Sequence, residues 1–171
     1  MNDPASPQHH FGLRRLEVES FKCVESAALE FGPGLNVLYG PNDLGKSSLG
    51  EAIRAVLLLP SSSSERKSFE AWGAAKPTRV RLSFTHRGQL WRVDKTWGEG
   101  TRAAALLERS SDGHVWSKEE TGRAVDAELR KMLGWGVREP GGRGAPKGLP
   151  KSFITTALLG LAHQGFVLRR E

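Results

Sequence analysis

A glycine-rich segment in the first third of the chain constrains its fold more than any other feature. It reads GPNDLGKSSL, and four residues separate Gly40 from the triplet Gly45-Lys46-Ser47. An apolar run, 35–39, comes before it, and apolar residues recur at helical spacing over 46–59 after it. A strand, such a loop and a helix in that order are typical of a phosphate-binding loop, the Walker A motif.

The motif has a physical basis for binding phosphate. Gly40 and Gly45 permit backbone torsions that let successive N–H groups point into one concavity, and the following helix adds its positive end. We expect Lys46 to be the catalytic residue that reaches the β and γ phosphates, Ser47 to bind Mg²⁺, and Ser48 to contact the α phosphate. The residues expected to contact the nucleotide from this loop are Gly40, Asn42, Asp43, Leu44, Gly45, Lys46, Ser47 and Ser48.

The hydrophobic pattern of the remaining chain predicts strands and helices around this loop. The run 35–39 is nearly continuously apolar, which is typical of a strand buried on both faces. The other expected elements are strands over 13–21 and 27–31, a hairpin over 78–97, a strand pair around Asp112-Gly113, a helix over 119–133 and an apolar helical stretch over 153–162.

Length and composition bound the class of protein. The 171 residues favour one domain, which we expect over 13–171 after a polar tail at 1–12. No run of eighteen apolar residues is present, so no membrane partner is expected. Cys23 is the single cysteine, which excludes an intrachain disulfide and favours a reducing, cytoplasmic setting.

The net charge of +6 and the pI near 9.8 favour a polyanionic partner, with nucleic acid first. A Gly/Pro-rich segment near the C-terminus either contacts a nucleic-acid phosphate backbone or is a solvated connection. The basic residues of this segment are Arg138, Arg143, Lys147 and Lys151. The five tryptophans are scattered, which favours packing over base stacking.

The loop and the residues before it resemble the ATPase heads of the SMC/RecF family. This branch of the ABC ATPases includes double-strand-break-repair and chromosome-organising proteins. The shared features are the G-P-N-x-x-G-K-S/T loop, an acidic residue at Asp43, the Phe21-Lys22 pair and the approach FGPGLNVLYG. The resemblance is close over 13–59 and loose beyond. It implies an α/β fold, the N-terminal lobe of an ABC-type P-loop NTPase with a mixed sheet and an antiparallel β-subregion.

The resemblance also implies cofactors, partners and two further site residues. ATP and Mg²⁺ are the expected cofactors, and the expected partners are DNA, a C-terminal lobe of the same family and a second head in an ATP-dependent dimer, with nucleoid association possible. Lys22 corresponds to a basic residue near the nucleotide, and a solvated surface lysine is the alternative. Gln164 corresponds to the Q-loop ligand of Mg²⁺, and a solvated glutamine is the alternative.

Hydrolysis needs features that the sequence does not display. A Walker B strand ends in an Asp-Glu pair, and the segment 103–108 lacks it, so we interpret this segment as an ordinary strand. No ABC signature is recognisable. We therefore expect an N-terminal half-head that is inactive until a C-terminal lobe completes it. Two alternatives remain: a small P-loop phosphotransferase, disfavoured by the forty or so residues before the loop, and a non-hydrolysing, nucleotide-dependent DNA-binding or partner-binding module.

Overall fold

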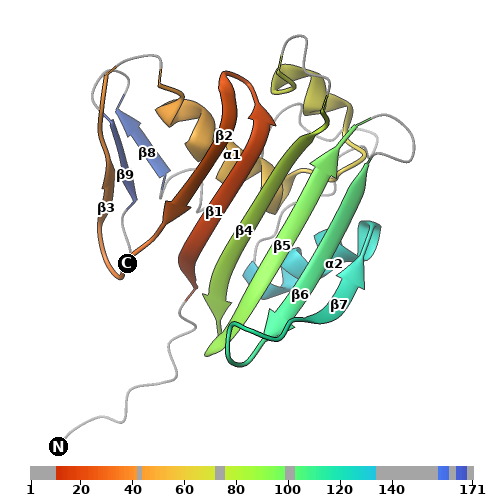
Figure 1. Cartoon of the computed structure of the whole chain (residues 1–171). Helices are drawn as coiled ribbons and strands as arrows, with labels where there is room; N and C mark the ends of the chain where they lie inside the picture. Colours follow the sequence, from red (N-terminus) through yellow and green to blue (C-terminus); the bar gives the residue numbers. More distant parts are fainter. Residues whose placement is uncertain are drawn as a thin grey trace, which may run out of the picture.

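The computed structural model describes residues 11–41, 44–71, 76–98, 103–133, 158–161 and 165–168. Its strands form a six-stranded sheet, in the order β2-β1-β4-β5-β6-β7, and a three-stranded sheet, in the order β3-β9-β8 (Figure 1). The helices α1 and α2 lie on the same face of the larger sheet. The α/β class predicted from the sequence is confirmed, and every pair among the described strands is antiparallel.

The elements follow the chain in a simple order. The strands of the larger sheet are β1 (Gly12–Phe21), β2 (Val24–Glu30), β4 (Thr78–His86), β5 (Gln89–Trp97), β6 (Ala104–Ser110) and β7 (Ser117–Thr121). The strands of the smaller sheet are β3 (Asn36–Leu38), β8 (Leu158–Leu161) and β9 (Gly165–Leu168). The helices are α1 (Lys46–Leu58), the short 3-10 helix η1 (Ser64–Ser68) and α2 (Arg123–Leu133).

Strict alternation of side chains determines the two faces of the larger sheet. In β4, Val80, Leu82 and Phe84 are fully buried beneath the helices, and the residues between them face outward. The hairpin predicted over 78–97 is therefore confirmed, with Leu82 opposite Val93. On the outer face, arginines and carboxylates from neighbouring strands pair across the sheet, namely Arg81 with Glu17, Arg79 with Asp94, and Arg92 with Glu108.

Aromatic residues fill the core between the sheet and α1. The rings of Phe21 and Phe69 stack with centroids 4.9 Å apart, and Phe69 meets Trp97 edge-on at 5.3 Å. Trp97 is fully buried and donates from Nε1 to Pro60 O at 3.0 Å. The packing role predicted for the tryptophans is confirmed at this position.

A buried ion pair joins β5 to both helices. Lys95 is fully buried, and its ammonium donates to Asp126 Oδ1 of α2 at 2.6 Å and to Leu59 O at 2.8 Å. Leu59 follows the last residue of α1, so Lys95 caps the C-terminus of that helix. Burial lowers the pKa of Lys95, and the charge of Asp126 opposes this effect.

Three expectations from the sequence are wrong in detail. The strand β3 is not buried on both faces, as the 55% exposure of Val37 shows. The reason is that β9 pairs with one edge of β3 and no described element covers the Val37 side chain. Residues 158–161, expected as helix, form strand β8, because β9 supplies backbone partners for them. The helix expected over 119–133 begins at Arg123, because Glu120 pairs with Leu107 in the sheet.

The longest described helix is α1, with 13 residues. Crossing the hydrocarbon core of a bilayer takes about 20 residues. None of the described helices is long and apolar enough to span a membrane.

Replacing Asp126 with alanine should leave the buried Lys95 ammonium without its carboxylate partner. We expect a loss of about 3–5 kcal/mol in the free energy of unfolding, measured by urea denaturation. The double variant Lys95→Met/Asp126→Leu should recover most of this loss, because it removes both charges. Glu128→Ala, which breaks an exposed pair with Lys131, should cost less than about 1 kcal/mol. An equal, small effect of Asp126→Ala and Glu128→Ala would contradict the buried pair.

Candidate nucleotide-binding site

The glycine-rich loop connects the edge of the smaller sheet to α1. The strand β3 ends at Leu38, and α1 begins at Lys46, so the strand, loop and helix predicted from the sequence occur in that order. Gly40 has a φ of +149° and Gly45 a φ of +77°, conformations that residues with side chains rarely adopt. Asn42 and Asp43, which the sequence places among the nucleotide contacts, lie outside the described residues.

The N-terminus of α1 is suited to an anion. Gly45 occupies the N-cap position and has no side chain with which to cap the helix. The first turn of α1 contains no acidic residue. The positive end of the helix dipole therefore has no negative charge within the first turn, and Ser47 in this turn is exposed.

The ammonium of Lys46 lies against its own loop. It donates to Gly40 O at 2.9 Å and to Pro41 O at 2.5 Å. The side chain is half-buried. These bonds hold a positive charge beside the backbone that precedes the helix, where a phosphate group would lie if the loop binds one.

The turn between β1 and β2 packs directly beneath the loop. A Cβ atom added to Gly45 would lie 2.6 Å from Val24 Cγ2 and 3.3 Å from Cys23 Sγ. Gly45 therefore needs to be glycine for two reasons, its backbone conformation and the close approach of Val24. The sequence predicted the first reason, and only the structure shows the second.

The two serines after Lys46 have different surroundings. Ser47 is exposed at the helix terminus. Ser48 is buried, and its Oγ lies 3.5 Å from Cys23 Sγ. The structure thus directs the hydroxyl of Ser48 toward the β1–β2 turn, and the α-phosphate contact expected for it stays a prediction.

Lys22 lies in the same turn and reaches α1. Its ammonium forms an ion pair with the carboxylate of Glu51, one helical turn beyond Ser47. Its φ of +51° is left-handed, and its backbone N–H donates to Phe69 O at 2.7 Å. Sequence reasoning missed Glu51, although the spacing of four residues from Ser47 places both on one face of the helix.

The donors for a magnesium ion are few in the described part of the chain. Ser47 offers one exposed hydroxyl, which suits a metal that keeps several waters and binds substrate phosphates. No group of three His, Cys, Asp or Glu residues that can hold a metal occurs among the described residues. Gln164, the second expected ligand, lies outside them.

Comparison with known proteins identifies the family. A family model described as an AAA domain matches residues 15–130. The chain belongs to this AAA-domain family. Among its relatives, a DNA double-strand break repair Rad50 ATPase of Methanopyrus kandleri is 29% identical over 126 residues, which is 71% of this chain and 14% of that protein. The DNA replication and repair protein RecF of Edwardsiella ictaluri is 31% identical over 140 residues, 81% of this chain and 36% of that protein.

One solved structure, of the recombination mediator protein RecF with ATP, has a TM-score of 0.43 and 20% identity over 71% of this chain and 31% of that chain. The family model together with the Rad50 and RecF relatives confirms the predicted resemblance of this AAA-domain chain to the N-terminal region of SMC/RecF-type ATPases. The chain spans 14% and 36% of these two relatives.

Gly45→Ala should disrupt the loop, because the added methyl group meets Val24 and the backbone is left-handed. We expect loss of nucleotide binding and a destabilisation of about 2–4 kcal/mol. Gly88→Ala is the matched control, since Gly88 has a φ of +75° and nothing within 4 Å of an added Cβ. Adding Val24→Ala to Gly45→Ala should restore part of the stability. Equal melting temperatures for Gly45→Ala and Gly88→Ala would show that contact with Val24 is unimportant.

Proposed function

We propose that this chain is the ATP-binding N-terminal half of an SMC/RecF-type ATPase head that acts in DNA repair or chromosome maintenance. The observation that carries the proposal is the N-terminus of α1, where a glycine N-cap, a first turn without acidic residues and the Lys46 ammonium converge. The names of the Rad50 and RecF relatives supply the biological setting. The cytoplasm, beside DNA, is the setting that we propose.

The loop and the start of α1 have proposed roles in binding Mg-ATP. Backbone N–H groups after Gly40 and at the start of α1 would bind phosphate oxygens, and Lys46 would neutralise the β and γ phosphates. The hydroxyl of Ser47 would hold Mg²⁺, together with Gln164 in the Q-loop role. The ion supplies charge stabilisation to the transferring phosphoryl group. A C-terminal lobe would supply the acidic pair and the signature that hydrolysis requires.

Titration calorimetry with Mg-ATP, combined with a phosphate-release assay, tests this function. We expect the chain to bind ATP without turnover, and Lys46→Ala to weaken binding at least about tenfold, since a charge-assisted contact to phosphate is lost. Lys131→Ala on α2 is the control, since that side chain is exposed and pairs with Glu128. Equal ATP affinity of the chain and of Lys46→Ala would refute the site. Robust turnover by the chain alone would favour the phosphotransferase alternative.

An exposed apolar strip beside the loop supports a partner at this edge of the chain. The strip consists of Leu35, Val37, Tyr39 and Leu44, which are 60%, 55%, 84% and 65% exposed. Val37 lies in β3, which pairs with β9 on one edge, and Leu35 and Tyr39 flank this strand at alternate positions. Contiguous exposed apolar residues mark interaction sites. We propose that the C-terminal lobe of the same family covers this apolar strip.

Val37→Glu should weaken association through the apolar strip. We expect the unmodified chain to self-associate in gel filtration when no C-terminal lobe is present, and to co-elute with a separately expressed lobe of the family. Val37→Glu should reduce both the self-association and the co-elution, because it places a charge where an apolar contact forms. Val115→Glu is the control, as Val115 is 71% exposed but lies between β6 and β7. Equal behaviour of the two variants would exclude a specific role of the strip.

DNA and a second head complete the proposed set of partners. Arginines on the outer face of the larger sheet pair with carboxylates, which leaves little free positive charge there for a phosphate backbone. The basic segment with Arg138, Arg143, Lys147 and Lys151 lies outside the described residues and is the proposed DNA contact. Binding of duplex DNA that weakens steeply with added KCl would support it, whereas a salt-independent affinity would oppose it.

A further inference from the structure

We infer that the Lys22 ammonium exchanges partners when ATP binds: it dissociates from Glu51 and binds the phosphates. Because Glu51 competes with the phosphates for this ammonium, it lowers the affinity of the site for ATP. This inference rests on the proposed ATP binding. It assigns to Glu51, which is outside the phosphate loop, the role of setting how tightly the loop holds its nucleotide.

The backbone around Lys22 is held firmly, so its side chain is the part that is free to move. The left-handed φ of +51° at Lys22 is maintained by the bond from its N–H to Phe69 O, 2.7 Å long. Ser20, two residues earlier, has the same φ, and its carbonyl accepts a 2.7 Å bond from Thr78 Oγ1. Conformations of this kind persist where several contacts over-determine them, and they cluster at functional sites.

The turn that carries Lys22 packs against the helix terminus where phosphate is expected. The next two residues, Cys23 and Val24, contact Ser48 and crowd Gly45. The partner of Lys22, Glu51, lies one turn after Ser47 on the same face of α1, and side chains on a helix lean toward the N-terminus. The pair therefore lies on the Ser47 side of the helix, with Glu51 about one helical turn after Ser47.

The ion pair is open enough for exchange. The side chains of Lys22 and Glu51 are 33% and 39% exposed. Pairs at such exposure contribute little, because solvent screens them. A polyphosphate carries more negative charge than one carboxylate and lies where the helix dipole also favours it, so it competes successfully for the ammonium.

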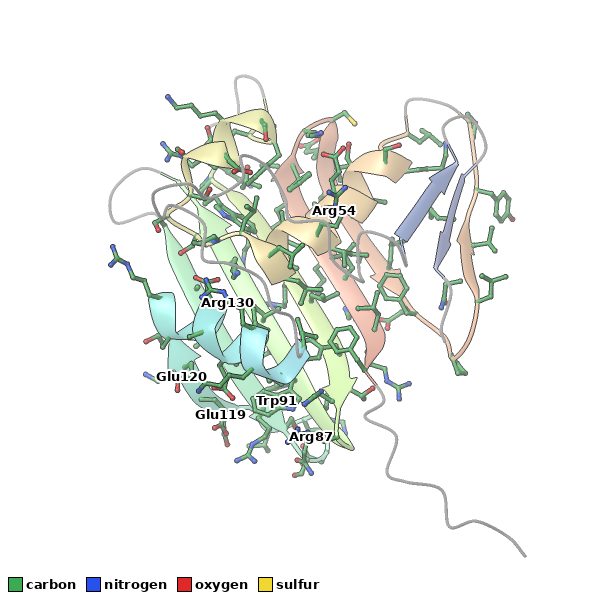
Figure 2. All side chains as sticks on the ribbon, turned by 180° about the vertical axis from the view of Figure 1, so that it is seen from behind. Arg54, Arg87, Trp91, Glu119, Glu120 and Arg130 are labelled. Atoms are coloured by element: carbon green, nitrogen blue, oxygen red, sulfur yellow. The ribbon has the colours of Figure 1, made fainter. Side chains whose placement is uncertain are left out.

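A second cation is available to the carboxylate that Lys22 would leave. Arg54 lies three residues after Glu51 on α1 and is labelled on that helix in Figure 2. Its Nε is buried and has no hydrogen-bond partner among the described residues. A glutamate three residues before an arginine is a favourable helix pair. After the exchange, Lys22 would pair with the phosphates and Arg54 with the Glu51 carboxylate, so that each anion has a cation.

The exchange predicts effects of opposite sign for the two partners. Glu51→Gln should tighten ATP binding about three- to fivefold, since it removes the competing carboxylate at a partly exposed site. Lys22→Gln should weaken ATP binding by a similar factor. In the Lys22→Gln background, Glu51→Gln should have a clearly smaller effect, because no ammonium remains to be released. Adenosine, which lacks phosphates, should bind all variants equally.

The experiment is a double-mutant cycle in calorimetry on the full chain, with ATP and adenosine at two KCl concentrations. The four proteins are the parent, Lys22→Gln, Glu51→Gln and the double variant. Glu128→Gln, which breaks the exposed pair with Lys131 on α2, is the control for loss of an unrelated ion pair. Melting temperatures confirm that each variant is folded, and the charge-neutral double variant keeps the cycle informative if a single variant is unstable.

The outcomes separate this inference from the proposed function. Failure of the parent to bind ATP overturns both. If the parent binds and Lys46→Ala does not, the proposed function stands, and unchanged or weaker binding by Glu51→Gln overturns the exchange alone. If Glu51→Gln tightens ATP binding equally with and without Lys22, the exchange is also overturned, because the effect would then come from repulsion between the Glu51 carboxylate and the phosphates. Tightening that depends on Lys22 and is absent for Glu128→Gln supports it.

Discussion

Burial of α1 along most of its length determines the direction in which the glycine-rich loop faces. From Ser48 to Leu58 nearly every side chain of this helix is buried, and the helix contacts both sheets. A helix of 13 residues is a rod about 20 Å long, so fixing its sides also fixes its N-terminus. The dipole, the glycine N-cap and Lys46 then point at one place, which would be the phosphate site.

The two ends of α1 are held in different ways. At the C-terminal end, Lys95 and Trp97 donate to the carbonyls of Leu59 and Pro60 from within the core. At the N-terminal end, the β1–β2 turn packs against Gly45, and the half-exposed Lys22 pairs with the helix. The C-terminal end is held by buried contacts, whereas the end beside the loop combines close packing with one partly exposed ion pair. Under the proposed exchange, binding and release of an anion would disturb an ion pair that water can already reach.

The described part of the chain has a face on which arginines pair with carboxylates and an edge with exposed apolar residues. Ion pairs between strands offset the arginines of the larger sheet, so that the excess positive charge of the chain is not concentrated on this face. The apolar strip of Leu35, Val37, Tyr39 and Leu44 instead lies beside the loop. A partner that covered this strip would approach the proposed nucleotide site from the side of β3, which suits the proposed lobe that completes the head.

The sequence by itself determined the local chemistry of the site. The roles proposed for Gly40, Gly45, Lys46 and Ser47 depend on backbone torsion, charge and a hydroxyl at fixed spacing, and neighbouring residues encode such properties directly. The hairpin over 78–97 and the helix α1 were equally predictable, because alternation and helical spacing are periodic within a single element.

Only the tertiary structure decided which distant segments meet. A short apolar run such as 158–161 suits a helix or a strand; it is a strand because it pairs with β9, which itself pairs with the distant strand β3. The exposure of Val37 depends on which elements lie over β3, and the crowding of Gly45 by Val24 depends on how the β1–β2 turn folds onto α1. The ion pair of Lys22 with Glu51 has the same origin. These contacts join residues far apart in the chain, and periodicity within one element carries no information about them.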